Sequence, residues 1–194
     1  MNIMVIAGYD VLADKIPDHQ HYVKSCCLLA EQLKIDLLIT VGGATNPDYP
    51  QLTEAEANYR IIKEKFSFYI HTFSVVVLPF GHTSADTLKR VKDYIEIEKI
   101  SVNKLVLCAE QSRLAGFLLD ALYVKLLDLA ESIIAYGHPF PDSKKDFISQ
   151  RRKMLMKVLS HHSSFFARAR RIYQRIHQKR VAKIKRKQEK SSRL

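Results

Sequence analysis

The stretch Asp36-Leu37-Leu38-Ile39-Thr40-Val41-Gly42-Gly43, with Thr53-Glu54-Ala55-Glu56 shortly after it, decides the fold of this chain. The first part is a continuous apolar run that ends in two glycines, which is typical of a strand covered on both faces. The second part is a helix start, because Thr53 can act as the N-cap and Glu56 stands where a capping box requires glutamate. A buried strand followed by a helix is the repeating unit of a parallel sheet.

The same unit recurs along the whole chain. Further apolar runs predict four more strands, at Asn2–Ala7, Ser74–Leu78, Asn103–Ala109 and Ser132–Tyr136. Segments with helical spacing lie between the strands, at roughly Pro17–Leu33, Thr53–Phe66, Ser84–Lys99 and Ser112–Leu129. Ser84 can cap the third helix, or it can contact a ligand. The order predicts an α/β, Rossmann-like three-layer sandwich with a mostly parallel five-stranded sheet and helices on both faces.

The charge is divided unequally between two parts of the chain. The 194 residues carry a formal net charge of +11. Up to Ser143 the chain has 13 Lys and Arg against 18 Asp and Glu, a balance of −5, whereas Lys144–Leu194 has 18 against 2, a balance of +16. We therefore predict a Rossmann-like domain over residues 1–143 and a basic helical tail over 144–194, with the Gly- and Pro-containing run Gly137–Ser143 at the boundary.

Composition excludes several protein classes. With 47% hydrophobic and 26% charged residues, the chain is neither disordered nor collagen-like. Its three cysteines, two of them adjacent at Cys26 and Cys27, form neither a disulfide framework nor a spaced metal motif. The uncharged run Phe66–Ala85 contains His, Pro and Gly, so we interpret it as a buried strand and a loop. We expect a cytoplasmic protein with no transmembrane segment.

Glycines mark the ends of the predicted strands. Gly8, Gly42, Gly43, Gly81 and Gly137 each follow a predicted strand, whereas Gly116 falls within a helix. Open parallel sheets bind ligands at the carboxyl ends of their strands, where glycine lets the backbone approach a ligand. The pattern indicates a ligand crevice at this edge of the sheet. The alternative is that the glycines only turn the chain.

Three segments of the body resemble the bacterial YdcF-like family, typified by the SanA, YdcF and ElyC proteins. Leu38–Gly43 followed by Thr53–Ala57 resembles the family's strand, paired glycines and Ser/Thr-Glu-Ala helix start. Ser84 and Thr87 match the family's Glu-x-x-Ser-x-Asn-Thr-x-x-Asn segment, but Gly81, Asp86 and Arg90 replace its other polar residues. After the fourth strand, Ser112 stands in place of the family's histidine and Ala115 in place of its arginine. The resemblance spans roughly residues 2–136.

This resemblance implies a Rossmann-like sheet that binds a nucleotide-like or phosphate-bearing small molecule. S-adenosylmethionine or a nucleotide is a ligand that the family suggests, with a link to envelope metabolism for some members. The sequence leaves open whether the chain is an enzyme, because the family's polar signature is incomplete here. It contains no Walker motif, no complete Gly-x-Gly-x-x-Gly fingerprint and no Gly-x-Ser-x-Gly elbow.

Several polar residues are candidates for contact with such a ligand. The amides of Gly42 and Gly43 can bind a phosphate or carboxylate, and Ser84 and Thr87 can add hydroxyls. Arg113 can pair with a ligand anion or, alternatively, with Glu110. The full set of ligand-binding candidates is Gly8, Gly42, Gly43, Glu54, His82, Ser84, Thr87 and Arg113.

Two of these candidates, Glu54 and His82, have side chains suited to catalysis. Glu54 can accept hydrogen bonds from a ribose or act as a base, or it can simply stabilise the helix start. His82 follows Gly81 at a strand end and is the best-placed histidine for acid–base chemistry, although a plain loop residue is the alternative. We expect no metal site, because His19-x-His21 and His161-His162 lack partners at ligand spacing. Cys26 and Cys27 lie in an apolar helical segment and are expected in the core.

The tail has the pattern of a basic amphipathic helix. Its apolar residues fall on one side of a helical projection, namely Phe165, Phe166, Ala169, Ile172, Tyr173, Ile176 and Ile184. Such a helix can dock on the body, contact nucleic acid or lie on an anionic membrane surface through Arg168–Leu194. The alternative function is therefore a non-catalytic binding protein whose tail recruits one of these partners.

Overall fold

Strands and helices alternate along the described chain as the sequence predicts. The computed structural model describes residues 1–8, 12, 15–44, 46, 48–79, 81 and 83–140. The strands are β1 (Asn2–Ala7), β2 (Leu37–Val41), β3 (Ser74–Leu78), β4 (Val102–Glu110) and β5 (Ala130–His138). The α-helices are α1 (Pro17–Gln32), α2 (Glu54–Lys65), α3 (Ser84–Ile97) and α4 (Gln111–Tyr123), and two short 3-10 helices are η2 (Ser67–His71) and η3 (Leu127–Leu129).

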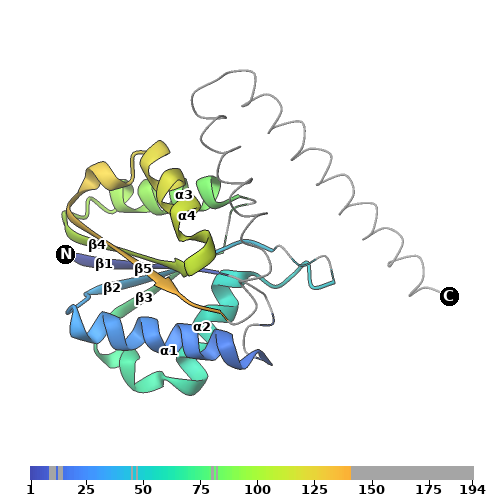
Figure 1. Ribbon diagram of the computed structural model, residues 1–194. Coiled ribbons are helices and arrows are strands. Elements are labelled where there is room, and N and C mark those ends of the chain that lie inside the picture. The colour runs from blue at the N-terminus through green and yellow to red at the C-terminus, as the bar shows by residue number, and fades with distance from the viewer. Residues whose placement is uncertain are drawn as a thin grey trace, which may run out of the picture.

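The five described strands form one parallel sheet in the order β3-β2-β1-β4-β5 (Figure 1). All four strand pairings are parallel, and Val5 of the central strand pairs with Ile39 of β2 and Leu107 of β4. The order runs outward from β1 in two directions, so the sheet has its topological switch point between β1 and β4. In open sheets of this kind, the carboxyl ends of the strands on either side of that point form the usual ligand site.

Each face of the sheet has its own hydrophobic core. Alternate residues of β1 illustrate the division, since Met4 and Ile6 pack under α1 and α2, whereas Ile3 and Val5 pack under α3 and α4. Figure 1 shows the two helical layers, with α1 and α2 on one side of the strands and α3 and α4 on the other. The predicted α/β three-layer architecture is therefore confirmed, and its sheet is entirely parallel.

Three local predictions are wrong. The predicted helix Ser112–Leu129 ends at Tyr123, because Lys125 adopts a left-handed conformation (φ 59°) and the chain turns to bury Leu126 before η3. The N-cap of α3 is Thr83 rather than Ser84, since the Asp86 amide donates to Thr83 Oγ1 (3.1 Å). Gly137 lies within β5 instead of after it.

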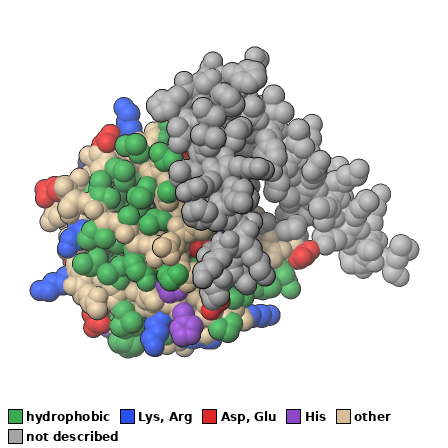
Figure 2. Space-filling view, in the orientation of Figure 1, with side chains coloured by type: hydrophobic (Ala, Val, Ile, Leu, Met, Phe, Trp, Pro, Cys, Tyr) green, Lys and Arg blue, Asp and Glu red, His purple; other side chains and the backbone are tan. Residues whose placement is uncertain are grey.

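Several large hydrophobic side chains stay exposed on the described surface. They gather in part on the face where β5 and α4 lie toward the viewer (Figure 2). The exposed set comprises Met1, Leu28, Tyr49, Phe68, Ile97, Leu122, Tyr123 and Ile133. Scattered exposed hydrophobic residues are ordinary on a protein surface.

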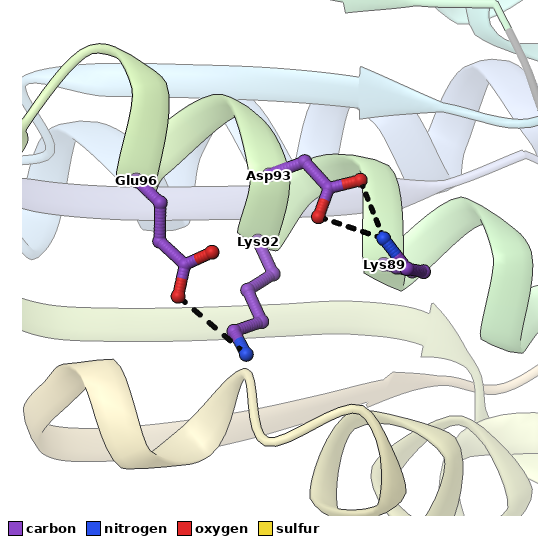
Figure 3. Close-up of polar contacts among 4 residues, drawn as sticks. All are labelled: Lys89, Lys92, Asp93 and Glu96. Atoms are coloured by element: carbon purple, nitrogen blue, oxygen red, sulfur yellow. Dashed lines mark hydrogen bonds and ion pairs between the residues drawn. The ribbon is translucent and has the colours of Figure 1, made fainter.

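The outer face of α3 carries two ion pairs (Figure 3). Lys89 Nζ lies 2.9 Å from Asp93 Oδ2, and Lys92 Nζ lies 3.5 Å from Glu96 Oε1. Each pair spans one helical turn with the lysine nearer the amino end, which is the weaker orientation on a helix. These contacts are surface features and contribute little to stability.

The predicted tail and the domain boundary at residue 143 lie outside the described residues. Among the residues that are described, no helix is long and apolar enough to cross a membrane.

Candidate functional site

The carboxyl ends of the strands bring most of the candidate residues to one edge of the sheet. Gly8 directly follows β1, Gly42 and Gly43 follow β2, and Gly81 comes shortly after β3. Glu110 is the last residue of β4. His82, together with residues 9–11, 13–14, 45, 47 and 80, lies outside the described residues.

Glu54 packs between the ends of β1 and β2. It is the first residue of α2, and only 8% of its surface is exposed. A Cβ atom added at Gly8 would lie 2.2 Å from Glu54 Cβ, and one added at Gly42 would lie 2.7 Å from both Glu54 Cβ and Glu54 Oε2. Neither glycine can therefore carry a side chain while Glu54 occupies this place. Gly42 also has a φ of 137°, which other residues rarely adopt.

The backbone amides in the first turn of α2 all have hydrogen-bond acceptors nearby. The amide of Glu54 donates to the carbonyl of Gly43 (3.2 Å), and the amide of Ala55 donates to the carbonyl of Gly42 (3.3 Å). The predicted capping box is confirmed, with the Glu56 amide donating to Thr53 Oγ1 and the Thr53 amide donating to Glu56 Oε2. The amides that would make this helix end an anion site are thus already used. An anion beside β2 would depend on the amides of Gly42 and Gly43 themselves.

The glycines after β2 and β3 contact each other. A Cβ atom at Gly43 would lie 2.1 Å from the carbonyl oxygen of Gly81. A Cβ atom at Gly81, whose φ is 128°, would lie 2.3 Å from Thr87 Oγ1. Thr87 is only 6% exposed. This part of the edge is close-packed, and Thr87 fills it from α3.

A buried hydrogen bond joins α3 to α4 beside this edge. Ser84 Oγ donates to Asp120 Oδ2, and Asp120 is fully buried. The sequence prediction missed Asp120, because a single aspartate within a helical pattern does not reveal which neighbouring helix it faces. Ser84 thus has a tertiary role that neither capping nor ligand contact describes.

The end of β4 differs from the end of β2 in how its helix begins. Glu110 occupies the N-cap position of α4, and its side chain does not cap the helix. Instead, Glu110 Oε1 accepts a hydrogen bond from Ser112 Oγ (2.6 Å), and Glu110 is 7% exposed. Arg113 follows in the first turn of α4 and is exposed. The uncapped helix start and Arg113 favour an anion here, whereas the buried Glu110 carboxylate opposes one.

Buried polar groups lie beneath the switch point on the α1–α2 side. Tyr22 Oη and Asn58 Nδ2 both donate to the carbonyl oxygen of Ala7, each at 3.3 Å. Burial raises the pKa of the Tyr22 hydroxyl, with smaller contributions in the same direction from Cys26 and Cys108, while the charge of Arg113 opposes the shift. The sequence offered no signal for this cluster, since its members come from α1, β1 and α2.

Cys26 and Cys27 are part of the core, as predicted. Cys26, Cys27 and Cys108 are all free and buried. Burial raises the pKa of Cys27 from 9.0 to about 12, and it also raises the pKa of Cys26. The thiols of Cys26 and Cys27 therefore stay protonated at neutral pH, which makes them poor nucleophiles.

The histidines near α1 pack as aromatic residues. His19 is buried, and its ring centroid lies 5.2 Å from that of Phe140. His138 lies 5.6 Å from the ring of Tyr22, and burial together with the neighbouring His21 lowers the pKa of His138. The described residues contain no group of three or more His, Cys, Asp or Glu side chains arranged to hold a metal ion.

Comparison with known proteins finds no matching family model and no significantly similar curated protein or solved structure.

Proposed function

We propose that this chain binds a nucleotide-like or phosphate-bearing small molecule at the carboxyl ends of β1 and β4. The observation that carries the proposal is the strand order β3-β2-β1-β4-β5. Successive strands are added on one side of β1 up to β3 and on its other side from β4 onward, so the topological switch point lies between β1 and β4. A YdcF-like identity, which the sequence resemblance implies, is part of the same proposal.

The charges at the edge support a ligand with two kinds of polar group. On the β4 side, the start of α4 and Arg113 favour a negative group such as a phosphate. On the β1 side, Glu54 lies against Gly8 and favours groups that donate hydrogen bonds, such as ribose hydroxyls. A nucleotide or S-adenosylmethionine combines hydroxyl donors with an anionic group, which is why these remain the proposed ligand classes.

Catalysis is a further step of the proposal. Glu54 and His82 stay the candidate acid–base residues. If Glu54 or His82 acts as the acid or base, replacing that residue in Glu54→Gln or His82→Gln should abolish the reaction. Ligand binding should survive in at least one of the two variants.

A thermal-shift screen tests ligand binding. Nucleotides, S-adenosylmethionine and sugar phosphates are added to the purified full chain, and we expect at least one of them to raise the melting temperature. Arg113→Ala should abolish the shift for a phosphate-bearing ligand. Lys24→Ala, which removes an exposed cation from α1, is the matched control and should leave the shift intact. No shift with any ligand would overturn the proposal.

A second candidate function rests on the +16 charge of Lys144–Leu194. In this alternative the chain is a non-catalytic binding protein, and Arg168–Leu194 contacts nucleic acid or an anionic membrane surface. Removing Lys179–Leu194 should then abolish salt-sensitive binding to RNA or to anionic vesicles while any small-ligand shift persists. Equal binding before and after truncation would exclude the tail as the binding element.

A further inference from the structure

The outer edge of β5 is a long strand edge that no other described strand covers. β5 has nine residues and pairs with β4 from Val102↔Ala130 to Glu110↔His138. Within the described part of the chain, β5 is the last strand on its side of the sheet. The opposite edge strand, β3, has only five residues. Short edge strands resist pairing with other chains, whereas long regular ones invite it.

The sequence of β5 lacks the usual protection against such pairing. Ala130-Glu131-Ser132-Ile133-Ile134-Ala135-Tyr136-Gly137-His138 contains no lysine and no proline, and Glu131 is its single carboxylate. Its register with β4 continues without a bulge from Lys104↔Ser132 onward. Lysine, proline and bulges are the devices by which native edge strands avoid pairing. Their absence here leaves β5 ready to accept a partner strand.

An apolar ridge of α4 lies beside this edge. Phe117 and Ala121 face the sheet, and Asp120 faces α3. Leu118 and Leu122 are one helical turn apart on the side of α4 opposite Asp120. This side points away from α3 and lies over β5.

On β5, Ile133 pairs with Leu105, so it lies on the same side of the sheet as α4. Leu122 is 57% exposed and Ile133 is 44% exposed, and Figure 2 shows hydrophobic side chains gathered on this face.

We propose that this surface joins two copies of the chain, with β5 of each copy pairing antiparallel about a twofold axis near Ile134. Such pairing is self-complementary, because the axis stands perpendicular to the sheet and places both α4 helices on the same face. Ile133 then lies opposite the partner's Ala135, a large side chain against a small one. Leu118 and Leu122 of the two copies cover that pair.

The charges of β5 are compatible with a second copy. In this register Glu131 lies opposite the partner's Gly137 on the α3–α4 face of the sheet, whereas His138 packs on the other face against Tyr22. The two Glu131 carboxylates are about six residues apart along the joined strands, or about 20 Å. No two like charges of β5 therefore meet across the pair.

The mass of the full chain in solution tests the proposal. We expect light scattering to give twice the 22.4 kDa of one chain. Ile133→Lys and, separately, Leu122→Lys should each return the protein to one chain, since both place a charge in the proposed contact. Phe68→Lys is the matched control, because Phe68 is 59% exposed at the far side of the molecule on η2, beside β3, and should leave the dimer intact.

Cross-linking gives a second readout that does not depend on a destabilising charge. The three native cysteines are buried, so Ala135→Cys supplies an exposed thiol. A short bismaleimide should join two Ala135→Cys chains and should join none when the cysteine replaces Phe68. A wild-type protein that stays at one chain, or a dimer that survives both lysine variants, overturns the proposal.

Discussion

The two halves of the sheet's carboxyl edge differ in how their polar groups are used. At the end of β2, the glycine carbonyls and the Thr53–Glu56 capping box take up the amides of the first turn of α2. At the end of β4, α4 starts without a side-chain cap, and Glu110 bonds to Ser112 instead. The β2 half is therefore a structural joint closed by its own hydrogen bonds, whereas the start of α4 lacks a side-chain cap. Glycines directly follow β2, whereas β4 is followed by Gln111, so the glycine pattern marks the joint and not the start of α4.

The largest effect should come from filling the close contact in the β2 half. Gly43→Ala places a Cβ atom 2.1 Å from the Gly81 carbonyl oxygen, so backbone must move. We expect a loss of about 3 kcal/mol in the free energy of unfolding. Gly137→Ala is the matched variant in the other half, where the nearest atom is the Cα of Gln111 at 3.1 Å. It should cost about 1 kcal/mol or less.

Urea unfolding of the full chain measures both variants. Equal losses in Gly43→Ala and Gly137→Ala would contradict the difference between the two halves.

A smaller effect should follow from removing the hydroxyl that joins α3 to α4. Ser84→Ala leaves the fully buried Asp120 without one hydrogen-bond donor, and we expect a loss of about 1.5–3 kcal/mol. Ser112→Ala removes a similar bond to Glu110 nearer the surface, where water can replace it, and should cost about 1 kcal/mol. The midpoints of urea unfolding compare the two. A larger loss in Ser112→Ala would reverse our ranking of these contacts.

Breaking the capping box at the start of α2 should lower the free energy of unfolding by less again. Thr53→Ala removes the acceptor for the Glu56 amide and breaks the capping box, at a cost of about 1 kcal/mol. Thr53→Ser keeps the hydroxyl and serves as the control, so thermal unfolding should separate the two variants. If Thr53→Ala and Thr53→Ser unfold alike, the hydroxyl does not hold the joint closed.

Local sequence patterns predicted the architecture because each depends on neighbouring residues. Apolar runs located all five strands, and Thr53 with Glu56 predicted the start of α2. The contacts between distant segments could not be found this way. Ser84 and Asp120 are 36 residues apart, and Asn58 reaches Ala7 across 51 residues. Only the packing of the helices on the sheet brings such pairs together.

The glycines show how a correct local prediction can leave the function open. Their positions at strand ends predicted a close backbone approach, and the structure has one. At Gly8 and Gly42, however, the approaching group is Glu54, and at Gly43 it is Gly81. Sequence alone cannot tell whether glycine makes room for a ligand or for another part of the protein, because both require the same missing side chain.

The smallest loss of stability should come from the ion pairs on the outer face of α3. It serves as the reference against which the losses at the carboxyl edge are compared. Lys89 is mostly exposed and pairs with Asp93 in the less favourable helical orientation. Lys89→Ala should therefore change the free energy of unfolding by no more than about 0.5 kcal/mol, and added salt should remove even that difference. A loss comparable to that of Ser84→Ala would mean that surface charge, rather than the packing of the carboxyl edge, stabilises this side of the sheet.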